Sequence, residues 1–158
     1  MLTHRKELIG QNAEKLLSIW PTAPIGVYSA GLKRKEAGRP ITFAGIGSVA
    51  KKPEAFFPTD LVLIDECHLV SNSDKTDYRK FLEAGLRYNP HMKVVGLTAT
   101  PYRHGMGDLT LGGVFTDRCY DLTGKEEFNR LLAEGFLARL VPRQTETELS
   151  AEGVSLRG

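Results

Sequence analysis

Two carboxylates and an imidazole stand close together in this sequence, at Asp65, Glu66 and His68. They end or follow a strand that we expect over residues 60–65, because residues 61–64 are all apolar and suit a strand buried on both faces. In open parallel sheets, ligands bind at the carboxyl ends of the strands. Enzymes that act on phosphate groups hold magnesium with a carboxylate at such a position. The sequence therefore predicts a site for phosphate chemistry at this strand end.

The order of the three residues suggests a separate task for each. Asp65 comes first and is placed to hold Mg²⁺ through water, since magnesium keeps several of its waters in proteins. Glu66 should point elsewhere, because successive side chains at a strand end diverge, and it is placed to orient or deprotonate an attacking water. His68 is placed to relay the state of the site to neighbouring segments. The alternative for an isolated Asp–Glu pair is a solvated strand end without a catalytic role.

A second buried strand is predicted over residues 93–97, and it ends in Thr98, Ala99 and Thr100. Both apolar runs are short and suit strands covered on both faces. We expect the two strands to be adjacent and parallel at the centre of the sheet.

Strand and helix patterns alternate along the rest of the chain. Apolar spacing predicts helices over residues 4–20 and 124–136, a short helix capped by Gly47 and Ser48, and a helix capped by Ser73 or Asp74. Further strands are expected over residues 25–29, 41–46 and 118–122, and loops over residues 31–40 and 102–113. This alternation is typical of an α/β fold with a parallel sheet and helices on both of its faces.

The composition sets loose bounds on the class of protein. A chain of 158 residues with 41% hydrophobic and 25% charged residues is typical of one soluble globular domain. The net charge of +2 is too small to indicate nucleic-acid binding by itself. The chain has two cysteines, Cys67 and Cys119, which are too few for a fold held together by disulfides. This cysteine content favours a reducing, cytoplasmic location. No apolar run approaches the roughly 20 residues of a membrane-spanning helix.

The residues Asp-Glu-Cys-His at 65–68 resemble motif II of superfamily 2 helicases in its DExH form, and residues 97–101 resemble motif III. Residues 2–8 resemble motif Ia, and residues 45–49 stand where motif Ib falls. Together with residues 28–36, 89–91 and 97–103, these segments resemble the bacterial RadD-type DNA-repair helicases and their phage relatives. The resemblance implies a RecA-like domain of the P-loop NTPase class.

The resemblance also implies roles for particular residues. It implies that Asp65 binds magnesium and that Glu66 activates the attacking water. It also implies that His68 and the Thr98–Ala99–Thr100 segment couple the state of the nucleotide to the binding of nucleic acid. The residues that it implies at the nucleic-acid backbone are Thr3, His4, Arg5, Gly47 and Ser48. Such turns lead into helix N-termini, whose free amides attract phosphates. The basic residues Lys33, Arg34 and Lys35 are either further phosphate contacts or a solvated loop.

Two parts of a complete motor are missing from this pattern. The chain has no Gly-Lys-Ser or Gly-Lys-Thr phosphate loop, since Gly124-Lys125 is followed by Glu126. It also lacks the second motor domain of such helicases. We therefore expect residues 1–140 to form a truncated RecA-like domain that starts at motif Ia, and residues 141–158 to form a linker. ATP and Mg²⁺ are then cofactors of the full-length parent, and the isolated chain is predicted to be inactive. Loss of the phosphate-loop strand predicts an unpaired sheet edge or a gap, followed by either local closure of the sheet or self-association.

Two other classes of function remain open from the sequence. The chain could be a non-catalytic module that binds single-stranded nucleic acid, DNA or RNA. It could also be a metal-dependent nuclease with Asp65, Glu66 and His68 as direct ligands, which would require further acidic ligands from other strands. Asp60 is at the opposite end of the predicted strand, which does not favour the nuclease.

Overall fold

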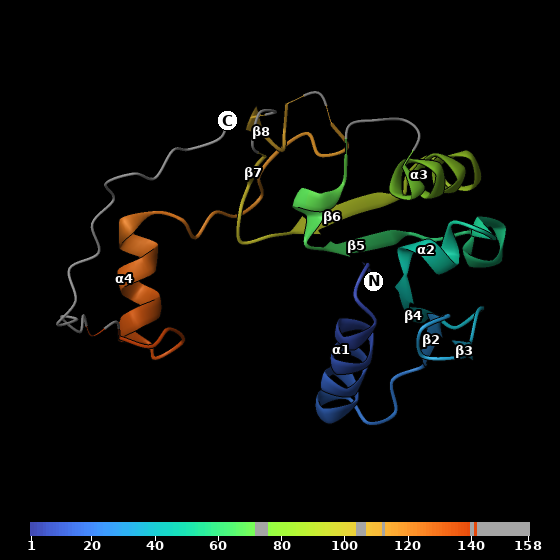
Figure 1. Ribbon diagram of the computed structural model, residues 1–158, viewed down its shortest axis with the longest axis horizontal. Helices are drawn as coiled ribbons and strands as arrows, with labels where there is room; N and C mark the ends of the chain where they lie inside the picture. The colour runs from blue at the N-terminus through green and yellow to red at the C-terminus, as the bar shows by residue number, and fades with distance from the viewer. Residues whose placement is uncertain (72–75, 104–106, 112, 140, 142–158) are drawn as a thin grey trace, which may run out of the picture. The chain divides into compact units, whose positions relative to one another are not determined.

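The computed structural model describes residues 1–71, 76–103, 107–111, 113–139 and 141 of the chain (Figure 1). The chain divides into two compact units, Met1–Arg118 and Cys119–Gly158. The first unit holds the sheet, and the described residues of the second hold one helix, α4 (Lys125–Ala133). None of the helices in the described part of the chain has the length and apolar composition that crossing a membrane requires.

The first unit is built on a six-stranded sheet with the order β3-β2-β4-β1-β5-β6. Its strands are β1 (Leu2–Thr3), β2 (Ile25–Ser29), β3 (Arg34–Lys35), β4 (Ile41–Gly45), β5 (Leu61–Asp65) and β6 (Lys93–Leu97). Every pairing is parallel except that of β3 with β2, which is antiparallel. The sheet is therefore mixed but mostly parallel, which confirms the predicted α/β class.

The two strands expected to be neighbours are neighbours, but they are not central. β5 and β6 pair in parallel register from Leu61 opposite Lys93 to Asp65 opposite Leu97. The prediction that both are central was wrong, because β6 is the last strand in the order and β1 separates β5 from β4. A strand of two residues such as β1 is too short to show an alternating pattern, so its place in the sheet could not be expected from periodicity.

Helices cover both faces of this sheet, and adjacent residues of β4 show how. Phe43 packs in a cluster with Ile9 and Ala13 of α1 (Lys6–Ile19). Ala44, the next residue, belongs to a second cluster that includes Phe81 of α3 (Asp77–Tyr88). Successive strand residues point to opposite faces, so α1 covers one face, and the other is covered by α3, α2 (Ile46–Val49) and η1 (Pro53–Phe56).

Several local predictions need correction. Gly47 and Ser48 lie inside α2, whose N-cap is Gly45, rather than at its cap. The cap of α3 is Thr76, whose hydroxyl accepts a hydrogen bond from the Arg79 amide at 3.3 Å. The alternatives Ser73 and Asp74 lie outside the described residues.

The predicted loops and the last predicted strand also differ from the structure. The loop over residues 31–40 contains β3, and the loop over residues 102–113 contains an antiparallel pair, β7 (Tyr102–Arg103) and β8 (Gly107–Asp108). Residues 118–122 form no strand. Instead the Asp121 carboxylate accepts hydrogen bonds from the amide and hydroxyl of Thr123, a local pattern that competes with strand pairing.

Helix α4 ends earlier than its apolar pattern predicts. Gly135 adopts φ +77°, and its amide bonds to the Leu132 carbonyl, while the amide of Phe136 bonds to the Leu131 carbonyl. This is a Schellman cap, which needs a residue that tolerates the left-handed region. The glycine therefore stops the helix before Phe136.

Candidate functional site

One edge of the sheet collects almost all the residues singled out from the sequence. Because β1, β2, β4, β5 and β6 run parallel, their carboxyl ends meet at a common edge. The segments that leave these strand ends carry the predicted residues: Thr3, His4, Arg5, Lys33, Gly47, Ser48, Asp65, Glu66, His68, Thr98, Ala99 and Thr100. Arg34 and Lys35 form β3, which starts from the same edge. The edge is thus a candidate site of the kind that open α/β sheets present.

The end of β5 turns sharply at Glu66. This residue has φ 53° and ψ 48°, a left-handed conformation that is uncommon for a residue with a Cβ atom. Its amide donates to the Asp65 Oδ1 atom at 3.1 Å, and its carbonyl accepts from Leu69 at 3.0 Å, which begins η2 (Cys67–Leu69). Strained backbone of this kind gathers at functional sites. The turn directs the chain away from the strand immediately after the first carboxylate.

His68 joins the ends of two strands. Its Nδ1 atom lies 2.9 Å from Thr98 Oγ1 and 3.3 Å from Glu66 Oε2. The Thr98 hydroxyl accepts from the Thr100 amide at 3.0 Å and lies 3.3 Å from the Thr100 carbonyl. A hydroxyl has one proton to donate. When that proton goes to the Thr100 carbonyl, His68 Nδ1 must carry the hydrogen that it shares with Thr98 and Glu66.

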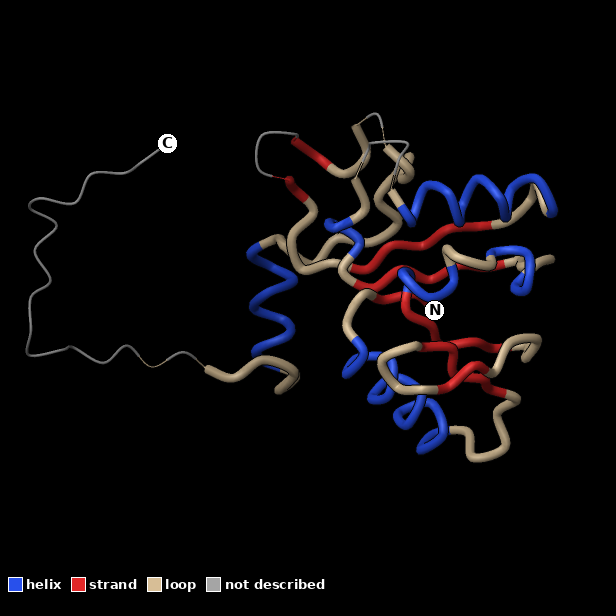
Figure 2. Tube along the Cα trace, turned by 45° about the vertical axis from the view of Figure 1, so that its right-hand side comes forward, coloured by secondary structure: helices blue, strands red, loops and turns tan. Residues whose placement is uncertain are grey.

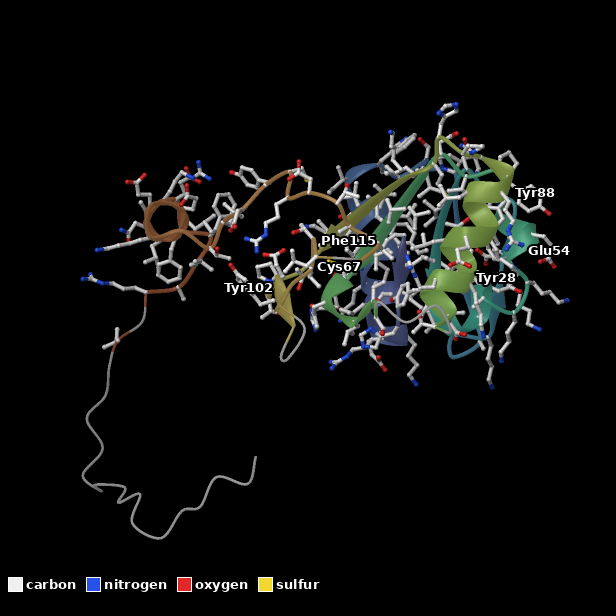
Figure 3. All side chains as sticks on the ribbon, turned by 90° about the horizontal axis from the view of Figure 1, so that it is seen from above. Tyr28, Glu54, Cys67, Tyr88, Tyr102 and Phe115 are labelled. Atoms are coloured by element: carbon white, nitrogen blue, oxygen red, sulfur yellow. The ribbon has the colours of Figure 1, made fainter. Side chains whose placement is uncertain are left out.

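Gly96 allows η2 to lie close against β6. A Cβ atom at Gly96 would lie 2.6 Å from Cys67 Sγ and 2.6 Å from a ring carbon of Phe115. Figure 3 shows Cys67 and Phe115 side by side at this place. Gly96 was not among the residues predicted for the site. A glycine directly after two valines in a predicted strand was the available signal, because it marks a close approach of other atoms.

Tyr78, at the start of α3, carries a second unexpected feature of the site. Its hydroxyl is buried and has no hydrogen-bond partner in the described part of the chain. The pKa of Tyr78 is raised to about 12, chiefly by burial and to a lesser extent by electrostatic interaction with Asp65 and Cys67. The apolar spacing of the helix includes this residue but gives no sign of a role at the site. Its O–H is a donor that remains available close to the acidic strand end.

The turn from β1 into α1 differs from the turn after β4. His4 and Arg5 are exposed, Thr3 is buried, and α1 begins without a side-chain cap. The amides of its first turn are therefore accessible to an anion. Gly47 is also exposed, but the Ser48 hydroxyl already accepts a hydrogen bond from the Ala30 amide at 3.0 Å.

The basic residues after β2 are not equivalent. Both guanidinium contacts of Arg34 with Glu36 are 2.9 Å long, and Glu36 also accepts from the Val27 amide at 3.0 Å. Arg34 therefore holds the pKa of Glu36 below its usual range and fastens β3 to β2. Lys33 and Lys35 are exposed. Among the described contacts, the ion pair of the hairpin joins Arg34 to Glu36 and involves neither lysine.

The acidic strand end suits a magnesium ion that brings most of its own ligands. The described residues contain no group of three His, Cys, Asp or Glu side chains that could hold a metal ion alone. Asp65 supplies one carboxylate, which is partly buried. Magnesium is commonly held by one or two carboxylates together with waters and substrate phosphates. The donor set therefore fits Mg²⁺ that arrives with a nucleotide.

A mostly parallel α/β sheet, with an acidic pair and a histidine at one strand end bonded to a threonine of the next, defines the helicase-like RecA class. The family model for the type III restriction enzyme, res subunit, matches residues 1–103. The chain belongs to this family, whose matched region is the N-terminal domain of superfamily 2 helicases. Its members are ATP-dependent enzymes that generally use ATP with Mg²⁺ and bind nucleic acids. A search of curated proteins finds no match to the sequence.

Proposed function

We propose that this chain forms part of an ATP-dependent DNA helicase or translocase motor of the RadD type, which acts in DNA repair in the cytoplasm. The observation that carries the proposal is the bridge from Glu66 through His68 to Thr98. It connects the carboxylate best placed for hydrolysis to the segment that leaves the neighbouring strand. A motor needs such a link, because nucleotide hydrolysis must change the grip on the nucleic acid.

The two carboxylates divide the chemical work in this proposal. When bound with ATP, Mg²⁺ supplies positive charge that neutralises the phosphate oxygens. Asp65 would hold the ion, and its contact with the Glu66 amide keeps the carboxylate oriented. Glu66 accepts the proton of the attacking water or orients that water. The left-handed backbone at Glu66 sets its carboxylate apart from that of Asp65.

His68 and motif III perform the coupling. A change in the proton or position of Glu66 alters the hydrogen bond that His68 Nδ1 shares between Glu66 and Thr98. Thr98 is bonded in turn to both backbone groups of Thr100. The segment Thr98–Ala99–Thr100 therefore receives the state of the acidic site directly.

The nucleic acid lies along the same edge of the sheet. The turn at Thr3, His4 and Arg5, the start of α2 at Gly47 and Ser48, and the exposed Lys33 and Lys35 contact its backbone. Backbone contacts position a strand without reading its sequence. Single-stranded DNA is the proposed ligand, and duplex DNA or RNA are bound through the same phosphates.

The chain needs a phosphate loop from outside its own sequence. No Gly-Lys-Ser or Gly-Lys-Thr occurs in it, so the sequence offers no phosphate loop to complement Asp65 and Glu66. We propose that residues 1–140 form a partial first motor domain and that residues 141–158 lead to a second. The edge of β6, which pairs only with β5 in the described sheet, is the place for an added strand or for self-association.

The test is DNA-stimulated phosphate release. The chain alone should give no turnover above buffer, and the chain joined to a phosphate-loop segment and a second motor domain should give robust turnover. Glu66→Gln should abolish that turnover, with Lys125→Gln as a matched control outside the site. Absence of turnover in the joined protein would overturn the proposal.

The two other functions are less well supported. A nuclease requires several metal ligands, and the described residues group no three of them. A non-catalytic nucleic-acid-binding module would use the same contacts but would not need the link between Glu66, His68 and Thr98. Metal-dependent cleavage of single-stranded DNA by the chain would favour the nuclease.

A further inference from the structure

The chain that leaves β6 forms a short hairpin outside the main sheet. Directly after Pro101, β7 pairs antiparallel with β8, and Tyr102 lies opposite Asp108. Figures 1 and 2 show these two strands as a pair separate from the six-stranded sheet. The Leu109 amide donates to the Pro101 carbonyl at 3.0 Å, and the Leu109 side chain is buried in the cluster on the α3 side. The hairpin therefore continues the Thr98–Ala99–Thr100 segment and is fastened to the first unit.

Asp108 is the polar centre of this hairpin. Its Oδ1 atom accepts hydrogen bonds from the amide of Thr110 at 2.9 Å and from the hydroxyl of Thr110 at 2.8 Å. Its Oδ2 atom accepts from the Arg118 guanidinium, and the exposed fractions of the two side chains are 21% for Asp108 and 30% for Arg118. The bonds from Thr110, and then the guanidinium, hold the pKa of Asp108 below its usual range. An ionised Asp108 therefore joins the hairpin to Arg118, ten positions further along the chain.

Arg118 also lies over the ring of the residue opposite Asp108. The Arg118 Cζ atom is 5.1 Å from the centroid of the Tyr102 ring, which is within the range of a cation–π contact. A planar guanidinium can pair with a carboxylate and stack on a ring at the same time. Because Tyr102 and Asp108 stand on the two strands of the hairpin, Arg118 contacts both strands. We call Tyr102, Asp108 and Arg118 the arginine clip.

The arginine clip stands where the first unit ends. The first unit runs to Arg118, and the second unit begins with Cys119. Between the hairpin and Arg118, the ring of Phe115 packs close to Gly96 and Cys67. The segment that leaves the hairpin is thus held at Phe115 and again at Arg118. The contacts of Arg118 therefore fix the point from which the second unit starts.

A continuous series of contacts leads from the acidic site to the arginine clip. The His68 Nδ1 atom lies 2.9 Å from the Thr98 hydroxyl, which accepts from the Thr100 amide at 3.0 Å. Tyr102 follows Thr100 by two residues and carries the guanidinium of Arg118 on its ring. Hydrogen-bonded and packed networks of this kind carry energetic coupling between separate sites.

We propose that Arg118 is a positioning residue that transmits the state of Thr98 to the start of the second unit at Cys119. A change in the bond between His68 and Thr98 shifts the segment that leads into Tyr102, and Arg118 follows through its contacts with Tyr102 and Asp108. This inference rests on the proposed motor function, which gives the transmission its purpose. It adds the residue through which the coupling segment acts on the chain beyond the first unit.

The test uses the whole chain with a nitroxide label on Cys119. Both cysteines are free, but Cys119 is exposed and Cys67 is buried, so the label is directed to the first residue of the second unit. Electron paramagnetic resonance measures the mobility of the label. Thr98→Val, Arg118→Gln and their combination form a double-mutant cycle, which isolates the coupling between the two residues. Circular dichroism checks that each variant is folded.

The controls separate transmission from general loosening. Thr98→Ser keeps the hydroxyl that contacts His68. Asp108→Asn opens the arginine clip from the side of its other charged partner. Arg130→Gln removes a second contact between an arginine and a tyrosine, the 2.8 Å bond from Arg130 to the Tyr120 hydroxyl, and leaves the arginine clip intact.

Thr98→Val should shorten the rotational correlation time of the label about twofold, because the segment that holds Tyr102 loosens. The same substitution should have no further effect in the Arg118→Gln or Asp108→Asn background. Its effect should persist in the Arg130→Gln background, and Thr98→Ser should leave the label unchanged.

An equal effect of Thr98→Val with and without Arg118 would overturn the inference, and so would a label that does not respond to Thr98→Val in the unsubstituted background. The measurement needs neither ATP nor nucleic acid. Absence of phosphate release in the joined motor would therefore overturn the proposed function alone, whereas additive effects in the cycle would overturn only the role of Arg118.

Discussion

The imidazole Nδ1 of His68 lies 2.9 Å from the hydroxyl of Thr98, across 30 positions of sequence. The first residue follows β5 and the second follows β6, and the parallel register of these strands brings their carboxyl ends to the same level. A contact of this length between side chains fixes the two strand ends relative to each other. It also links the acidic site to the segment that follows β6.

The first prediction concerns the tautomer of His68. With the Thr98 proton donated to Thr100, the imidazole carries its hydrogen on Nδ1. Thr98→Val together with Glu66→Ala removes both acceptors of the Nδ1–H group and should shift the ring toward the Nε2–H form, which is the commoner form of a free neutral imidazole. Nitrogen-15 NMR of the imidazole measures the change. The Nε2–H form in the unsubstituted protein would contradict this hydrogen-bond assignment.

Gly96→Ala should destabilise the first unit. The new Cβ would lie 2.6 Å from Cys67 Sγ, so η2 or Phe115 must move, at a cost of about 1–3 kcal/mol. Gly10→Ala is a matched control, because nothing lies within 4 Å of its Cβ position in α1, and alanine there should add about 1 kcal/mol of stability. Urea unfolding measures both. An equal effect of the two substitutions would show that Gly96 is not tightly packed.

Tyr78 should make stability fall at alkaline pH. Its folded pKa of about 12 lies above the ordinary value of 10, so the folded state keeps the proton longer than the unfolded state. The associated stability is complete below pH 10 and is lost as the pH rises from 10 to 12. By the size of the shift it amounts to about 2–3 kcal/mol. Tyr78→Phe should remove this part of the pH dependence, which denaturant titrations at pH 9, 10 and 11 would reveal.

The amino group of Met1 should give a pH dependence of opposite sense near neutrality. Its pKa falls from 8.0 to about 6 on folding because the group is buried. Between these values the unfolded state holds a proton that the folded state has lost, so stability rises with pH from 6 to 8. Acetylation of the amino group should flatten the curve over this interval.

Lys33 and Lys35 should contribute to nucleic-acid binding more than Arg34 does. Each lysine that neutralises a phosphate adds about 0.7 to the slope of log affinity against log salt for a single strand. The Lys33→Ala, Lys35→Ala variant should therefore reduce the slope by about 1.4. Arg34→Ala, which removes the ion pair with Glu36, should leave the slope nearly unchanged while it loosens β3. Fluorescence anisotropy with a labelled oligonucleotide at several salt concentrations separates the two outcomes.

The strands with the strongest apolar pattern were the best predicted. The bounds expected for residues 25–29 and 93–97 match β2 and β6, and the predicted strand over 60–65 differs from β5 by one residue. Periodicity could not reveal β1 or β3, because two residues carry no period. The edge position of β6 depends on which strand lies on its other side, and no local pattern specifies that.

The site was predictable in its residue types but not in its contacts. The acidic pair and the following histidine stand out in the sequence, and the parallel sheet brings them to one edge with Thr98. The roles of Arg34 and Tyr78 depend on long-range packing: Glu36 becomes the partner of Arg34 only when β3 folds back, and Tyr78 approaches Asp65 only when α3 docks. Side chains of this kind acquire their function from tertiary structure.

The left-handed backbone at Glu66 lowers conformational stability, whereas the proposed chemistry requires the carboxylate of this residue. Glycine adopts φ 53° without penalty, whereas a residue with a Cβ atom gives up about 1–2 kcal/mol there. A library varied at position 66 and selected only for thermal resistance should therefore enrich glycine and asparagine. The same library selected for motor activity, in a protein that supplies the phosphate loop, should return to glutamate. A difference between the residues that the two selections enrich would measure the stability that the protein loses by keeping glutamate at position 66.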